Sequence, residues 1–86
     1  MGKNRNIMTT ELIKSVVNRT DSKPIEKNQL FCYFASRYTN LRLIDIAKII
    51  DRTHADVIYS IRVIINRRKT DRKYFEKVEM IKQSLK

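Results

Sequence analysis

The residues of this chain that are best suited to bind a ligand lie between Arg52 and Arg62. The stretch reads RTHADVIYSIR, and it opens with short or polar side chains. Thr53 followed by Asp56 has the form of a capping box, with Asp in the place where Glu is usual, so a helix is predicted to begin at Thr53. Small and polar side chains at a helix start can approach base edges or thymine methyl groups in a DNA major groove.

A second apolar helix is predicted immediately before this stretch. Its inward positions share the spacing of one helix face: Leu43, Ile46, Ala47 and Ile50. Asp51 and Arg52 then break the pattern and leave a turn of only one or two residues. Two helices joined so tightly cross at a steep angle, as they do in a helix-turn-helix. We therefore predict a helix-turn-helix over about residues 42–67.

Three further helices are predicted around this pair. The five helices are expected at about residues 9–18, 25–38, 42–50, 53–67 and 71–85. A polar stretch rich in turn formers, residues 19–24, separates the first two. The sequence thus predicts an all-α fold of about five helices, as one domain over residues 8–86 after a flexible N-terminus, residues 1–7.

Each predicted helix has an apolar face that is expected to form the core. In the first helix these residues are Leu12, Ile13, Val16 and Val17, and in the second they are Leu30, Phe31, Phe34, Ala35 and Tyr38. In the fourth they are Val57, Ile58, Ile61, Ile64 and Ile65, and in the fifth they are Tyr74, Phe75, Val78, Ile81 and Leu85. Tyr33 alone among the aromatics of the second helix is expected to point away from this face.

The charge of the chain favours a nucleic acid as its partner. Nineteen Lys and Arg stand against 9 Asp and Glu, a net charge of +10. Charge alone does not decide the function, because lysine-rich surfaces also serve solubility. The cations at 67–69 allow two interpretations. They either complement the dipole at a helix C-terminus or contact phosphate.

The composition excludes several classes of function. His54 is the only histidine, Cys32 the only cysteine and Gly2 the only glycine. One His and one Cys give no metal-ligand cluster, and one Gly cannot build a nucleotide-binding loop. We therefore expect a binding module and not an enzyme, with no cofactor and no metal. The unpaired cysteine and the lack of a long apolar run predict a cytoplasmic protein that does not bind a membrane.

The order of these elements resembles a known family. Tyr38-Thr39-Asn40 followed by the apolar helix and then Arg52 to Val57 is similar to the C-terminal DNA-binding domain of the bacterial replication initiator DnaA. That domain shares its helical fold with the tryptophan repressor. Its recognition signature reads G-G-R-D-H-[ST]-T-V, of which this chain keeps the Arg, the His and the Val. The resemblance spans roughly residues 8–85 and includes an arginine at position 62.

The resemblance implies a role for each residue at the proposed interface. The residues implied in DNA binding are Arg52, Thr53, His54, Ala55, Asp56, Tyr59 and Arg62 near the major groove, Thr39, Asn40 and Arg42 at phosphates, and Lys23 and Lys27 at the backbone or minor groove. From periodicity alone His54 lies nearer the core edge, but the resemblance favours base contact. The chain departs from the family in lacking the paired glycines, and Glu26 falls where the family has a minor-groove arginine.

Other functions and contexts remain open at this stage. The main alternative is a protein-interaction module that binds a replication or transcription protein, with Cys32, Tyr33 and Val63 as its apolar patch. An RNA-binding protein is a weaker alternative, because single-strand readers usually expose several aromatics. A monomer and a homodimer are both compatible with the resemblance. Met1 and the divergent motif favour a free-standing regulator, for example from a phage, acting in the bacterial cytoplasm or nucleoid.

Overall fold

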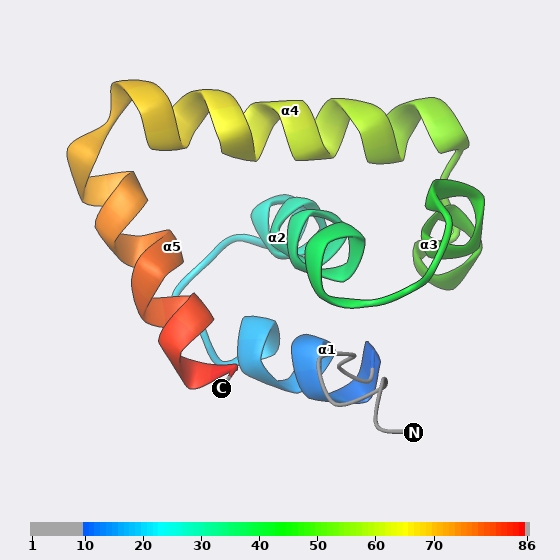
Figure 1. Ribbon diagram of the computed structural model, residues 1–86, viewed down its shortest axis with the longest axis horizontal. Coiled ribbons are helices and arrows are strands. Elements are labelled where there is room, and N and C mark those ends of the chain that lie inside the picture. The colour runs from blue at the N-terminus through cyan, green and yellow to red at the C-terminus, as the bar shows by residue number, and fades with distance from the viewer. Residues whose placement is uncertain (1–9, 86) are drawn as a thin grey trace.

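Five helices follow one another along the chain and share one apolar core (Figure 1). The computed structural model describes residues 10–85. The helices are α1 (Thr10–Asn18), α2 (Pro24–Tyr38), α3 (Leu43–Ile50), α4 (His54–Thr70) and α5 (Arg72–Ser84), with no strand in the described part of the chain. The all-α fold with about five helices is confirmed, and each boundary lies within three residues of its predicted place. The predicted flexible N-terminus lies outside the described residues.

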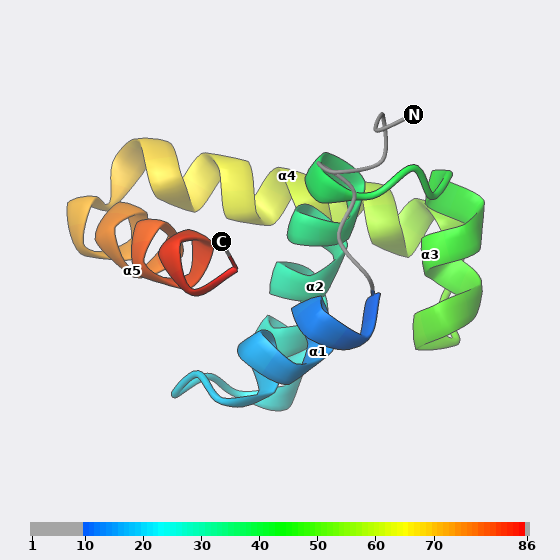
Figure 2. The same cartoon turned by 60° about the horizontal axis from the view of Figure 1, so that its bottom comes forward.

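The helix at the centre of the fold is α2. Figure 1 views it almost along its axis, with α4 above it, α1 below it, and α3 and α5 on its two sides. Figure 2 shows the same helix from the side, with its C-terminal end beside the start of α3. Its residues 30–35 are all buried, and it packs directly against α1, α3 and α4. A helix enclosed on several sides is apolar around most of its circumference.

Tyr33 corrects one prediction about α2. Its side chain is only 4% exposed, and its ring lies edge-on to that of Phe34 with 5.1 Å between the ring centroids. The guanidinium carbon of Arg68, on α4, lies 5.9 Å from the centroid of the same ring. The prediction that Tyr33 points away from the core is wrong, because α4 covers a second side of α2 that the single apolar stripe did not indicate.

Two other predicted core residues lie at the edge of the core. Leu12 on α1 is 41% exposed and Phe75 on α5 is 39% exposed. The remaining predicted positions of these two helices are buried: Ile13, Val16, Val17, Tyr74, Val78, Ile81 and Leu85. Each of these outer helices reaches the core with a narrow stripe, so a residue one position off that stripe stays partly in water. On α4, Val57 and Ile64 are buried, while Ile61 and Ile65 are partly buried against them.

Candidate nucleic-acid interface

The turn between α3 and α4 is closed by backbone hydrogen bonds. Asp51 adopts the left-handed conformation, with φ 57° and ψ 49°. The amide of Arg52 donates to the carbonyl oxygen of Ala47 at 2.9 Å. This hydrogen bond, which spans five residues of the chain, is characteristic of a Schellman motif. Glycine usually fills the left-handed position, and Asp is one of the few other residues that tolerate it. Three non-helical residues, 51–53, join the helices here, compared with the one or two predicted.

The first turn of α4 is held by a reciprocal pair of hydrogen bonds. The hydroxyl of Thr53 accepts from the amide of Asp56 at 3.1 Å, and the Asp56 carboxylate accepts from the amide of Thr53 at 3.3 Å. The predicted capping box is therefore confirmed. One oxygen of each side chain is occupied in positioning the helix start, so the two residues orient this end of α4 whatever it contacts.

The tip of α4 projects into solvent. All five residues from Arg52 to Asp56 are exposed, and Tyr59 is 65% exposed one turn later. Ala55, Tyr59 and Arg62 share one side of the helix, because they follow one another at i, i+4 and i+7. The exposure of His54 excludes its interpretation as a core residue. This end of α4 can therefore meet a ligand without any rearrangement of the core.

A shallow cleft of about 180 Å³ joins this tip to the beginning of α2. Its lining consists of Ile25, Asn28, Gln29, Ile50, Arg52, Asp56, Tyr59 and Ser60. Ile25, at 66% exposure, is as open to solvent as Tyr59 across the cleft. The sequence analysis did not select Ile25, Asn28 or Gln29. Their spacing of i, i+3 and i+4 on α2 was the available signal, because it places a mostly polar side next to the apolar stripe.

The residues predicted to bind phosphates at the start of α3 form local contacts. The hydroxyl of Thr39 donates to the carbonyl of Ala35 at 2.7 Å and accepts from the amide of Leu41 at 3.1 Å. The guanidinium Nε of Arg42 lies 3.1 Å from the Asp45 carboxylate, which also accepts from the Arg42 amide. Thr39 therefore holds the end of α2, and Arg42 is shared with a carboxylate of its own helix.

The pair formed by Arg42 and Asp45 has a clear electrostatic signature. The hydrogen bond from Arg42 holds the pKa of the Asp45 carboxyl below its usual range, and the same bond raises the pKa of Arg42. The Arg42 side chain nevertheless remains 77% exposed. Asn40 beside it is also exposed. A phosphate can therefore approach this end of α3, although Arg42 would exchange one anionic partner for another.

The two lysines predicted to reach the DNA backbone lie in different surroundings. Lys23 precedes α2 and is exposed. The Nζ of Lys27 donates to the carbonyl of Asn18 at 3.1 Å, which ties the start of α2 to the end of α1. Neither lysine lines the cleft beside Arg52. Lys23 is thus the more accessible of the two.

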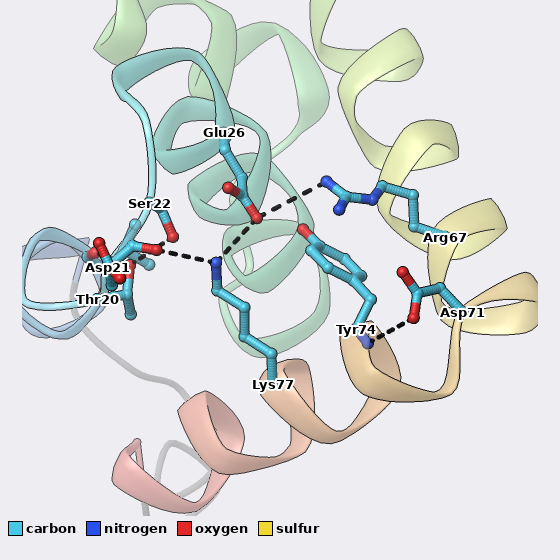
Figure 3. Close-up of polar contacts among 9 residues, drawn as sticks. Thr20, Asp21, Ser22, Glu26, Arg67, Asp71, Tyr74 and Lys77 are labelled. Atoms are coloured by element: carbon cyan, nitrogen blue, oxygen red, sulfur yellow. Dashed lines mark hydrogen bonds and ion pairs between the residues drawn. The ribbon is translucent and has the colours of Figure 1, made fainter.

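Glu26 belongs to a cluster that joins α2 to α4 and α5 (Figure 3). Its Oε2 lies 3.1 Å from the Nζ of Lys77 and 3.8 Å from the Nη1 of Arg67, and its side chain is 17% exposed. Lys77 also donates to the carbonyl of Asp21 at 3.2 Å. The position at which the family resemblance placed a minor-groove arginine therefore holds a carboxylate that ties helices together.

Tyr74 completes this cluster from α5. The guanidinium carbon of Arg67 lies 3.8 Å from the centroid of its ring. Burial raises the pKa of the Tyr74 phenol, and the charge of Glu26 raises it further. In Figure 3 the hydroxyl of Tyr74 points between Glu26 and Arg67. The phenol therefore stays protonated, and its ring serves as a surface for the arginine.

The cations at 67–69 are divided between structural contacts and solvent. Arg67 belongs to the Glu26 cluster, and the Nη2 of Arg68 lies 3.7 Å from the Oε2 of Glu79 on α5. Lys69 is exposed. Contacts between helices thus account for two of the three cations, an outcome that neither of the two sequence interpretations included.

The remaining nucleophile and the potential metal ligands do not form a reactive site. Cys32 is fully buried, and burial raises the pKa of its thiol to about 11. A neutral, enclosed thiol is a poor nucleophile. In residues 10–85, no three of the His, Cys, Asp and Glu side chains gather closely enough to hold a metal ion.

Comparisons with known proteins identify no relative. No protein-family model matches the chain, and searches of curated proteins and of solved structures found no match either. The resemblance to the DnaA domain therefore stays a prediction. Among the helices of residues 10–85, none combines the length and the apolar character that crossing a membrane requires.

Proposed function

We propose that this chain binds double-stranded DNA and that the N-terminal end of α4 enters the major groove. One observation carries the proposal. A capped, exposed helix tip follows a tight left-handed turn, in a chain whose net charge is +10. In helix-turn-helix proteins the second helix uses its N-terminal residues to contact bases, while the first crosses the backbone. The α3–α4 pair supplies the same order of elements.

The side chains of α4 then take separate roles. His54 and Ala55 stand at the first turn and make no capping bond with their side chains, so they are available to base edges and thymine methyl groups. Tyr59 and Arg62 continue the same contact along the helix. Arg52 stands at the mouth of the groove and binds phosphate. Asp56 holds the helix start and also turns phosphates away from its own position.

The backbone contacts come from the elements on either side. Asn40 and Arg42 lie at the N-terminal end of α3, where the helix dipole favours an anion. Arg42 can leave Asp45 for a phosphate at little cost, because its side chain is 77% exposed and water screens an exposed ion pair. Lys23 contacts the backbone from the start of α2. Thr39 and Lys27 support this surface through the bonds that hold α2 in place.

The proposed biological role is the regulation of transcription or replication. The resemblance to the DnaA domain, a domain of a DNA-binding replication protein, supports this role. Because Glu26 occupies the place of the family's minor-groove arginine, we propose a target sequence that differs from the initiator's box.

The decisive experiment is a selection of random duplex DNA by the purified 86-residue chain at physiological salt. A sequence-specific reader enriches a defined motif, whose length and symmetry distinguish a monomer from a dimer. If about six phosphates are neutralised, the affinity falls with a log–log salt slope near −5. Recovery of no motif, together with a slope near zero, would refute the proposal.

Two variants separate the roles of backbone and base contacts. Arg52→Ala should weaken binding to all duplexes, whereas Ala55→Ser should change which bases the selection recovers. Lys14→Ala is the charge-matched control for Arg52→Ala, because Lys14 is an exposed lysine on α1, outside the proposed interface. Equal losses for Arg52→Ala and Lys14→Ala would contradict the assignment of the groove to the tip of α4.

A protein-interaction module remains the second candidate, on a different surface from the one predicted. Cys32 and Tyr33 are buried and Val63 is half-buried, so these residues form no apolar patch. A groove of about 710 Å³ between α1 and α5 instead exposes Met80 at 72%. A Met80→Gln variant should retain duplex binding if DNA is the partner. Loss of a captured protein partner with unchanged duplex binding would favour the second candidate.

A further inference from the structure

The corner between α4 and α5 forms a depression away from the proposed duplex interface. It has a volume of about 410 Å³ and is lined by Arg68, Lys69, Thr70, Arg72, Phe75 and Glu76. Asp71 alone separates the two helices, and its carboxylate caps α5 by accepting from the amide of Tyr74 at 3.2 Å. Figure 1 shows this corner at the opposite end of α4 from α3.

Cations dominate the lining of this depression. Arg68, Lys69 and Arg72 stand against the single carboxylate of Glu76. The pair formed by Arg72 and Glu76 is long, at 3.9 Å, and its side chains are 90% and 64% exposed. Water screens such a pair strongly, so Arg72 is free to exchange Glu76 for an incoming anion.

Arg68 leaves one hydrogen-bond donor unused at the corner. Its Nη2 faces Glu79 on α5, but its Nε is buried and has no hydrogen-bond partner among residues 10–85. Buried polar atoms without partners are uncommon in folded proteins, so this one calls for a partner. Because Arg68 lines the depression, an acceptor that enters there would come close to its guanidinium group.

An aromatic ring lies beside these cations. Phe75 is 39% exposed, and the guanidinium carbon of Arg68 lies 5.0 Å from the centroid of its ring. A partly exposed ring next to cations is the combination by which proteins bind unpaired nucleotides. The base stacks on the ring or on the guanidinium, and the cations meet the phosphate.

We propose that this corner is a second binding site and that it takes one unpaired nucleotide. The phosphate lies between Lys69 and Arg72, and the base packs against Phe75 and the guanidinium of Arg68. The nucleotide is either free or part of a single strand, since both present the same base face and phosphate. A duplex fits less well, because its stacked bases are hidden and would leave Phe75 without a partner.

The site is separate from the proposed duplex interface. The 17 residues of α4 span about 25 Å at 1.5 Å per residue, so a ligand at the corner does not touch His54. The proposal consequently does not depend on duplex binding at the other end. An Arg52→Ala background weakens duplex binding at the α4 tip and leaves the corner unchanged.

The test is fluorescence anisotropy of a labelled thymidine pentanucleotide on the Arg52→Ala chain. Phe75→Leu keeps the apolar contact with the core but removes the stacking surface, and should weaken binding about five- to tenfold. Lys69→Ala should weaken it as well. The charge-matched control is Lys14→Ala, an exposed lysine on α1. Far-UV circular dichroism confirms that the helices persist in each variant.

The outcomes divide cleanly. Unchanged binding by Phe75→Leu and Lys69→Ala, or an equal loss in Lys14→Ala, would overturn the proposal by indicating general attraction to the basic surface. Competition by adenosine monophosphate but not by inorganic phosphate supports the site and identifies free nucleotide as its source. If unlabelled pentanucleotide competes and adenosine monophosphate does not, the result supports the site and identifies a single strand as the source of the nucleotide. Equal competition by a blunt duplex would overturn it.

Discussion

The two ends of α4 carry similar numbers of polar residues but place them in different surroundings. At the N-terminal end, the residues from Arg52 to Asp56 are exposed, and the capping bonds there join near neighbours in the chain. At the C-terminal end, Arg67 and Arg68 reach across to Glu26 on α2 and Glu79 on α5. A cation in the sequence is therefore not automatically available to a ligand, because the fold decides whether another helix already holds it.

This difference also separates local from long-range stabilisation. The capping bonds of Thr53 span three residues, whereas the bond between Lys77 and Glu26 spans 51. Loss of a local bond frays one turn of helix, but loss of a long-range bond loosens the packing of whole helices. Substitutions at the C-terminal end should consequently cost more stability than substitutions at the N-terminal end.

The largest effect is expected from Glu26→Gln. This change leaves two partly exposed cations without their carboxylate, and should lower the free energy of unfolding by about 1–3 kcal/mol. Urea denaturation measures the change. The matched control is Glu76→Gln, whose pair with Arg72 is exposed and should contribute below about 1 kcal/mol. Equal effects of the two substitutions would contradict the contrast between long-range and local contacts.

A smaller effect is expected from Thr53→Ala at the other end. Removing the N-cap hydroxyl should cost about 1 kcal/mol of stability. His54→Ala next to it should leave stability within about 0.5 kcal/mol of the parent, since the side chain is exposed, but should weaken duplex binding. Thermal denaturation and a duplex titration of both variants provide the measurements. A destabilised His54→Ala chain would show that this end is also structural.

The turn before α4 allows a stabilising substitution. Asp51→Gly should raise the free energy of unfolding by about 0.5 kcal/mol, because the left-handed conformation costs a residue with a Cβ more than it costs glycine. Asp51→Ala should lower it, since alanine tolerates this conformation poorly. Urea denaturation of these two variants distinguishes the effect of backbone conformation from the effect of the lost charge, because both variants remove the carboxylate. Stabilisation by both variants would instead indicate that the Asp51 charge is unfavourable.

The smallest effect is expected at the start of α3, where the pair of Arg42 and Asp45 is again local. Because the folded state lowers the pKa of Asp45, its contribution is present above the unfolded value near 4 and is lost as the pH falls through the folded value. Below about pH 4, the Asp45→Asn chain should therefore lose slightly less stability on acidification than the parent chain does. Thermal unfolding from pH 2 to pH 6 measures it, and an unchanged acid profile would contradict the assignment.

Local signals in the sequence were sufficient for the helices and for the turn at the centre of the site. Periodicity placed all five helices, because amphipathic spacing depends only on residues a few positions apart. Thr53 and Asp56 indicated the capping box for the same reason, as both partners lie within one turn. The residues at 51 and 52 marked the end of α3, although the residue that takes the left-handed conformation was not predicted.

Tertiary structure alone decided which side chains are buried or engaged in contacts between helices. The burial of Tyr33, the role of Glu26 and the contacts of Arg67 depend on helices that lie far apart in the sequence. The cleft that brings Ile25 beside Tyr59, and the depression around Phe75, likewise arise from two helices meeting. Helix period and capping chemistry are properties of a short segment, so the sequence determined them by itself. Partners across the core are chosen by packing, which no single segment specifies.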